Sequence, residues 1–131
     1  MKVDNFEDFH KIIQGNNQNL TVYRGVKNEL YELLPKVGRK EFTWEHKSVK
    51  DAEKHMLSLF KQRAIPYLKF TPRTDWEWLA LAQHHGLPTR LLDWSRNPLV
   101  AAYFAVNEEA GTDSAIYVLK STKNPVSSEE E

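Results

Sequence analysis

Cysteine is absent from the 131-residue sequence, which excludes disulfides, thiolate nucleophiles and zinc sites with cysteine ligands. A net charge is absent as well, because 18 acidic residues balance 18 basic ones. The chain therefore has no overall field that would draw it to nucleic acid or to an anionic membrane. No apolar run approaches the roughly 18 residues that a membrane-spanning helix needs, and the N-terminus lacks the apolar core of a signal peptide. We expect a cytoplasmic protein without a membrane partner, and we do not expect nucleic acid as a partner.

The composition is that of a globular protein, with 40% hydrophobic and 27% charged residues. A chain of this length suits one domain with a single core. We predict one α+β domain over residues 1–119, in which several helices pack on a small sheet. Residues 120–131 are polar and are expected to form a disordered tail.

Helical periodicity and capping residues predict helices over Asp4–Gly15, Ser48–Ala64 and Asp75–His84, and a further helix that starts near Pro98 after a cap at Ser95 or Asn97. For the helix over residues 75–84, we expect Asp75 to be the N-cap without a capping box. Its apolar face is predicted to consist of Trp76, Leu79, Ala80 and Gln83.

Two runs rich in β-branched and aromatic residues predict strands. The first covers Leu20–Tyr23 and ends at Arg24-Gly25, and the second covers Ser114–Leu119. The second is almost continuously apolar, which is typical of a buried strand. Between the last two helices, Thr89–Trp94 is predicted to be a buried extended segment.

Residues 83–105, QHHGLPTRLLDWSRNPLVAAYFA, crowd polar groups between apolar segments. Gly86 is expected to take the left-handed conformation that ends a helix, and Pro88 prevents the helix from continuing. The polar residues therefore lie at helix ends and in a turn, where scaffolds often present functional groups.

Glu53 interrupts the apolar stripe of its helix and is predicted to point inward, the alternative being an exposed position. A buried carboxylate needs a cationic partner or a raised pKa. Arg24, Arg39 and Arg90 are the candidate partners.

Arg24 at a strand end suits the binding of an anion, and the alternative is an ion pair with Asp93 or Glu53. Asp93 either caps the next helix or meets Arg24. Consecutive residues on a helix point about 100° apart, so His84 and His85 are not expected to share a metal. We predict His85 to be a general base or a donor to substrate, and His84 to be structural.

The chain resembles the FRG domain family of bacterial and phage proteins over about residues 20–119. The matching residues are Tyr23-Arg24-Gly25, Leu34-Pro35, Arg39, Glu53, Phe60, residues 78–86, 88–94 and 97–105, and Ile116-Tyr117-Val118-Leu119. The string QHHGLPTRLLDW is specific, and Tyr23 stands where the family name has phenylalanine.

A second and weaker similarity is to the ADP-ribosyltransferase superfamily, in which a strand arginine supports NAD and a hydroxyl residue shapes the nicotinamide pocket. The resemblance implies NAD as cofactor, Arg24 as the arginine, and Thr89 or Ser95 as the hydroxyl residue. That superfamily also uses a glutamate on a later strand, and the glutamates after Leu119 are those at 129–131. This leaves three alternatives. Glu53 or Asp93 takes the role of that glutamate, the chain is part of a longer protein that supplies it, or the transferase activity is absent.

Two functional classes follow. In the first, the protein is an enzyme or enzyme-derived domain that binds NAD or another nucleotide in a cleft and acts in conflict between bacteria and phages. Its predicted catalytic residues are Glu53, His85 and Asp93, and its predicted cofactor-binding residues are Arg24, Thr89, Arg90 and Ser95. In the second, the chain is a non-catalytic interaction or sensor module with a protein partner. A metal-dependent hydrolase is least favoured, because the histidines and acidic residues lack metal-ligand spacing.

Overall fold

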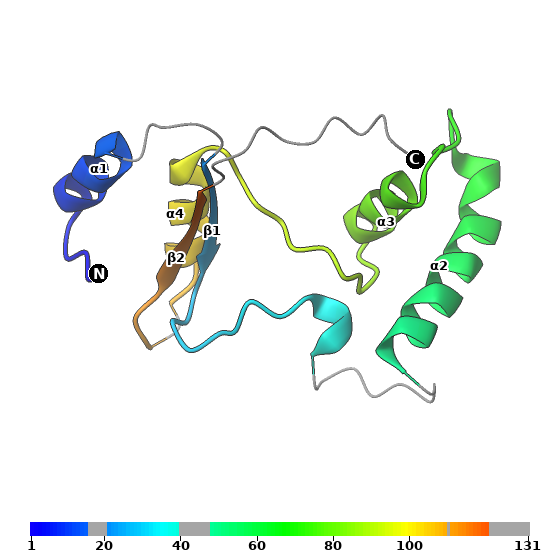
Figure 1. Ribbon diagram of the computed structural model, residues 1–131, viewed down its shortest axis with the longest axis horizontal. Helices are drawn as coiled ribbons and strands as arrows, with labels where there is room; N and C mark the ends of the chain where they lie inside the picture. The colour runs from blue at the N-terminus through cyan, green and yellow to red at the C-terminus, as the bar shows by residue number, and fades with distance from the viewer. Residues whose placement is uncertain (16–20, 40–47, 110, 121–131) are drawn as a thin grey trace. The chain divides into compact units, whose positions relative to one another are not determined.

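The computed structural model describes residues 1–15, 21–39, 48–109 and 111–120. It divides into two compact units, which we treat separately. The sheet unit joins Met1–Tyr31 to Asp93–Glu131, and the helical unit is Glu32–Leu92. The described elements include α-helices and a two-stranded antiparallel sheet (Figure 1), so the predicted α+β class is confirmed. One domain over residues 1–119 stays a prediction, and residues 121–131 of the expected tail lie outside the described part.

The sheet of the sheet unit pairs β1 (Thr21–Val26) with β2 (Ala115–Lys120), with Arg24 opposite Tyr117. The other edge of β1 forms a single bridge, in which Tyr23 and Ser95 exchange two main-chain hydrogen bonds of 2.7 and 2.8 Å. The unit also contains α1 (Phe6–Gly15), whose first turn is capped by Asn5 through a 2.9 Å bond from the Asp8 N–H.

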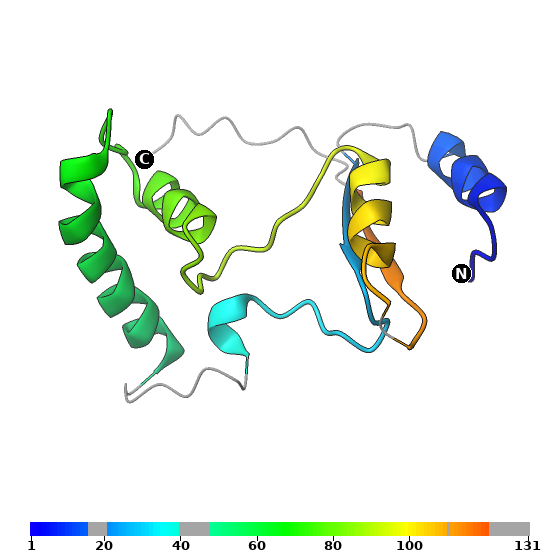
Figure 2. The same ribbon diagram turned by 180° about the vertical axis from the view of Figure 1, so that it is seen from behind.

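Helix α4 (Pro98–Val106) lies against one face of the sheet, as Figures 1 and 2 show from opposite sides. Small residues permit the close approach: Ala101 and Ala105 are buried, and a Cβ atom on Gly25 would overlap the main-chain carbonyl of Ala101. The predicted cap is confirmed at Asn97, whose side chain accepts a hydrogen bond from Leu99 N–H at 2.9 Å. Val100 and Phe104 on the same helix are exposed.

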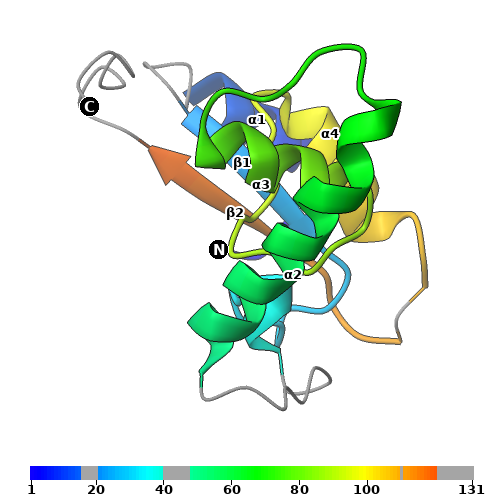
Figure 3. The same ribbon diagram turned by 90° about the vertical axis from the view of Figure 1, so that its right-hand side faces the viewer.

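The helical unit contains a short 3-10 turn, η1 (Lys36–Gly38), the helix α2 (Val49–Ala64), a second turn, η2 (Ile65–Tyr67), and the helix α3 (Asp75–His84). Helices α2 and α3 contact each other (Figure 3). Ser48 caps α2, as predicted, by accepting a hydrogen bond from Asp51 N–H at 3.1 Å. Pro66 falls just past the end of α2, where the sequence placed the stop.

The prediction for the start of α3 is wrong. Thr74, not Asp75, is the N-cap, and its hydroxyl accepts from Glu77 N–H at 3.2 Å while the Glu77 carboxylate accepts from Thr74 N–H at 3.3 Å. This reciprocal pair is a capping box, and the spacing Thr-x-x-Glu that signals it begins one residue earlier than we assumed. The predicted face is corrected too: Trp78, Leu79 and Ala82 are buried, whereas Trp76 is 65% exposed.

The strand predictions are right in place but wrong in detail. Arg24 and Gly25 lie inside β1 rather than at its end, and Leu20 is outside the described residues. The second strand is less buried than its composition indicated, with Val118 40% and Leu119 54% exposed. The segment over Thr89–Trp94, predicted to be buried and extended, is only partly buried: Thr89 is buried, whereas Arg90 and Asp93 are exposed. Residues 91–94 lie in no strand, and the bridge to β1 follows at Ser95.

Candidate functional site

The predicted site residues fall into two groups, one in each unit. Arg24, Asp93 and Ser95 belong to the sheet unit. The helical unit holds Glu53, His85, Thr89 and Arg90. Each group is described on its own below.

In the sheet unit, Arg24 contacts the segment that follows the Gly-Leu-Pro turn. Its Nη1 donates a 2.6 Å hydrogen bond to the main-chain carbonyl oxygen of Asp93. The predicted meeting of Arg24 and Asp93 is therefore present, but the group that accepts here is a carbonyl. Ser95, two residues on, pairs with Tyr23, and its Oγ accepts from Asn97 N–H at 3.0 Å.

The face of β1 that carries Arg24 follows from the strand's alternation. Gly25 points at α4, and Tyr23, on the same side, is buried. Side chains alternate along a strand, so Arg24 projects from the opposite face. Its cross-strand partner Tyr117 shares that face and donates through its hydroxyl to the Tyr31 carbonyl at 2.9 Å. Tyr117 was not predicted as a site residue, although the sequence places it in the second strand run.

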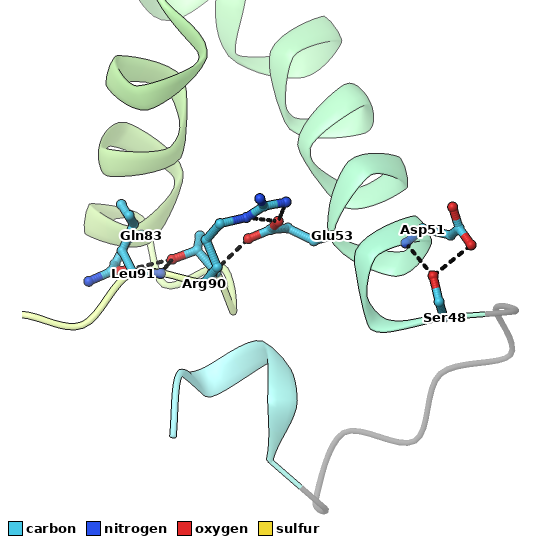
Figure 4. A network of polar contacts seen from close by, with 7 residues as sticks. Ser48, Asp51, Glu53, Gln83, Arg90 and Leu91 are labelled. Carbon is cyan, nitrogen blue, oxygen red and sulfur yellow. Dashed lines mark hydrogen bonds and ion pairs between the residues drawn. The ribbon is translucent and has the colours of Figure 1, made fainter. Parts of the chain in front are cut away.

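In the helical unit, Glu53 is buried and binds Arg90, so the inward orientation is confirmed and Arg90 is the partner among the three candidates. Figure 4 shows the arrangement: the carboxylate on α2 reaches the turn after α3. Its Oε1 accepts the main-chain N–H of Arg90 at 2.6 Å, and its Oε2 accepts Nε at 2.5 Å and also contacts Nη2. The bond to Glu53 raises the pKa of Arg90, so the guanidinium stays charged. One carboxylate thus fixes both the backbone and the side chain of Arg90.

Thr89 is nearly fully buried, and its hydroxyl makes two hydrogen bonds within the same turn. The hydroxyl donates to Oε1 of Gln83 at the end of α3 and accepts from Leu91 N–H at 3.2 Å. The main-chain oxygen of Thr89 accepts from Val37 N–H of η1 at 3.4 Å. Both hydrogen bonds of the Thr89 hydroxyl stabilise the turn. The part of Gln83 in this stabilisation was not predicted from the sequence.

The turn begins at the paired histidines. His85 is the C-cap of α3, and Gly86 follows with φ of +90°, which confirms the left-handed glycine. Both histidine side chains are exposed, with ring centroids 5.4 Å apart, and the ring of His85 lies 6.0 Å from that of Phe60. Since both side chains are exposed, neither ring packs in the core.

Other features of the described residues add little to the predicted site. They include no group of three or more histidine, aspartate or glutamate side chains able to hold a metal ion. None of the described helices has the length and apolar character needed to cross a membrane. An open concavity of about 590 Å³ in the sheet unit is lined by Lys27, Glu108 and Asp113 among others, and by none of the predicted site residues.

Comparison with known proteins gives one match. The family model described as FRG domain matches residues 19–114. No curated protein and no solved structure matches the chain.

Proposed function

Because the chain belongs to the FRG domain family, we propose that it binds an anionic nucleotide, NAD in the first place, through Arg24 of the sheet unit. The observation that carries the proposal is the contact between Arg24 and the Asp93 carbonyl. It brings the arginine of the Tyr-Arg-Gly motif together with the end of the most specific string in the sequence. A guanidinium can bind the two oxygens of a phosphate at once, which suits the pyrophosphate of a dinucleotide.

The surroundings of Arg24 support a nucleotide in particular. Tyr117 is directly opposite on β2, and side chains opposite each other in an antiparallel pair are close enough to act on one ligand. A cation that takes a phosphate and an aromatic ring that takes a base or a ribose are complementary to a nucleotide.

Transfer of ADP-ribose is the finer part of the proposal and rests on the resemblance to ADP-ribosyltransferases. That reaction needs a carboxylate to orient the ribose. Within the sheet unit, Asp93 is exposed and its main chain already contacts Arg24, so we assign this role to Asp93. A part in conflict between bacteria and phages is the biological setting that the resemblance implies.

The test is a thermal-shift titration with NAD, ADP-ribose and nicotinamide. A ligand at 100 times its Kd stabilises the folded state by about 2.7 kcal/mol, which gives a readily measured rise in Tm. We expect NAD and ADP-ribose to raise the Tm and nicotinamide to have little effect. Arg24→Lys should weaken the response, and Arg96→Lys, at an exposed position of the same unit, should keep it. No shift with any nucleotide would overturn the proposal.

A second function, a non-catalytic interaction module, is favoured by a different observation. The hydroxyl of Thr89 and the carboxylate of Glu53 are bonded to other groups of the chain. In this case the polar residues of the motif stabilise the fold, and a surface of the protein binds the partner. It predicts that Arg24→Ala or Asp93→Ala unfolds the protein and that no nucleotide protects it.

A further inference from the structure

The turn after α3 holds an arginine that is fixed on one side and open on the other. The side chain of Arg90 is 49% exposed, whereas that of its partner Glu53 is only 5% exposed. A carboxylate removed from water in this way is costly unless its hydrogen bonds are made, and here both oxygens accept from Arg90. Glu53 therefore fixes the position of the Arg90 guanidinium from its buried side.

The hydrogen bonds of the guanidinium leave one of its edges available. An arginine side chain has five N–H donors in a planar fork. Glu53 accepts from Nε and contacts Nη2. The two hydrogens of Nη1 and the second hydrogen of Nη2 have no partner among the residues that the structure describes. One hydrogen of Nη1 and the second hydrogen of Nη2 face the Nη1–Nη2 edge, which can donate two parallel hydrogen bonds to one anion.

We propose that Arg90 is an anion-binding residue for a phosphate group and that Glu53 is the residue that positions it. The ligand binds end-on, with two phosphate oxygens on the Nη1–Nη2 edge. Arg90 belongs to the helical unit and Arg24 to the sheet unit, and this proposal does not rest on the nucleotide contact proposed for Arg24.

The positioning by Glu53 has a consequence that opposes simple electrostatics. The Arg90–Glu53 pair is neutral as a whole, so electrostatic attraction alone predicts that Glu53 weakens anion binding. Its benefit is entropic: an arginine side chain loses rotamer freedom when a ligand orders it, and here folding has already ordered it. Removal of the glutamate charge should therefore weaken anion binding, although it makes the local charge more positive.

The test is a titration with inorganic pyrophosphate, followed by heteronuclear NMR of the arginine Nε–Hε groups. The Arg90 signal is assigned by its loss in Arg90→Lys, and Arg63→Lys, at an exposed position of α2, is the matched control. We expect a saturable shift of the Arg90 signal. Pyrophosphate binding, followed by the main-chain amide signals of the turn, should weaken about tenfold in Arg90→Lys, the equivalent of one lost charge-assisted hydrogen bond, and stay unchanged in Arg63→Lys.

Glu53→Gln separates positioning from attraction. Several-fold weaker binding in this variant, with the fold intact by circular dichroism, supports the positioned site. Binding that is equal or tighter overturns it, as does an Arg90 signal that ignores pyrophosphate. If Glu53→Gln does not fold, Glu53→Asp, which shortens the side chain and keeps the charge, replaces it, with the same outcomes. The Arg24 signal in the same spectra reports on the nucleotide proposal, so failure of one is distinguishable from failure of the other.

Discussion

Replacing Glu53 with glutamine removes its charge and keeps its shape. The carboxylate uses two accepting edges, one for the main-chain N–H of Arg90 at 2.6 Å and one for its Nε at 2.5 Å. An amide has a single accepting oxygen. Whichever way the glutamine turns, its NH₂ group faces one of these donors. The variant therefore loses one charge-assisted hydrogen bond and gains a contact between two donors.

The expected loss of stability follows from these contacts. A hydrogen bond to a charged group contributes about 1.5–3 kcal/mol, and breaking a buried ion pair costs about 3–5 kcal/mol. Arg90 is half-exposed, so water takes over part of the solvation of its guanidinium. We therefore expect a loss between the two ranges, about 3 kcal/mol.

Urea denaturation followed by tryptophan fluorescence measures this loss, because the buried Trp78 lies in the same unit. With a slope of about 1–3 kcal/mol per molar urea, the midpoint should fall by roughly 1–3 M. Glu109→Gln makes the same chemical change at an exposed position and should stay within about 0.5 kcal/mol of the natural protein. A loss for Glu53→Gln no greater than that of the control would refute the account of this pair.

Two further predictions concern packing and pH. Gly25→Ala should cost about 1–3 kcal/mol or more in urea denaturation, because the added methyl overlaps α4; Gly15→Ala, where no atom lies within 4 Å of the new methyl, should be neutral, and equal effects would contradict the close approach. The main-chain N–H groups of Arg73 and Thr74 donate to Glu77 and lower its pKa, so this carboxylate stabilises the fold above its unfolded pKa of about 4.3 and the contribution is lost as the pH falls through the lowered folded value. Thermal melts between neutral and acid pH should therefore show a steeper decline in Tm for the natural protein than for Glu77→Gln, and parallel profiles would count against this linkage.

Much of the fold was predictable because local signals specify it. Ser48, Asn97 and Gly86 occupy the cap positions that their side chains or backbone freedom favour. The inward turn of Glu53 was also predictable, because a single carboxylate breaks an otherwise apolar stripe. Where two caps compete, as at Thr74 and Asp75, the choice depends on a side chain three residues on, and there the prediction failed.

The contacts of the site were less predictable because they join residues far apart in the sequence. Glu53 had three arginines as candidate partners, and composition alone does not choose among them. The choice of Arg90 depends on the turn that brings its main-chain N–H and its guanidinium to the same carboxylate. Likewise, an apolar run such as 115–119 indicates a strand, but the burial of its side chains depends on which elements cover the two faces of the sheet.

The division of the sequence between the two units has a consequence for synthesis. The helical unit is one uninterrupted stretch of sequence, so its residues leave the ribosome one after another without residues of the sheet unit between them. The sheet unit is split: β1 emerges early, while its partners β2 and α4 come from the far end of the chain. Until residues 95–106 have been made, β1 has both hydrogen-bonding edges open and Gly25 uncovered, and the edge that pairs with β2 stays open until Lys120 has been made; an open edge favours pairing with another nascent chain. For this protein, the interval between the first strand and the last is when misassembly competes most strongly with folding.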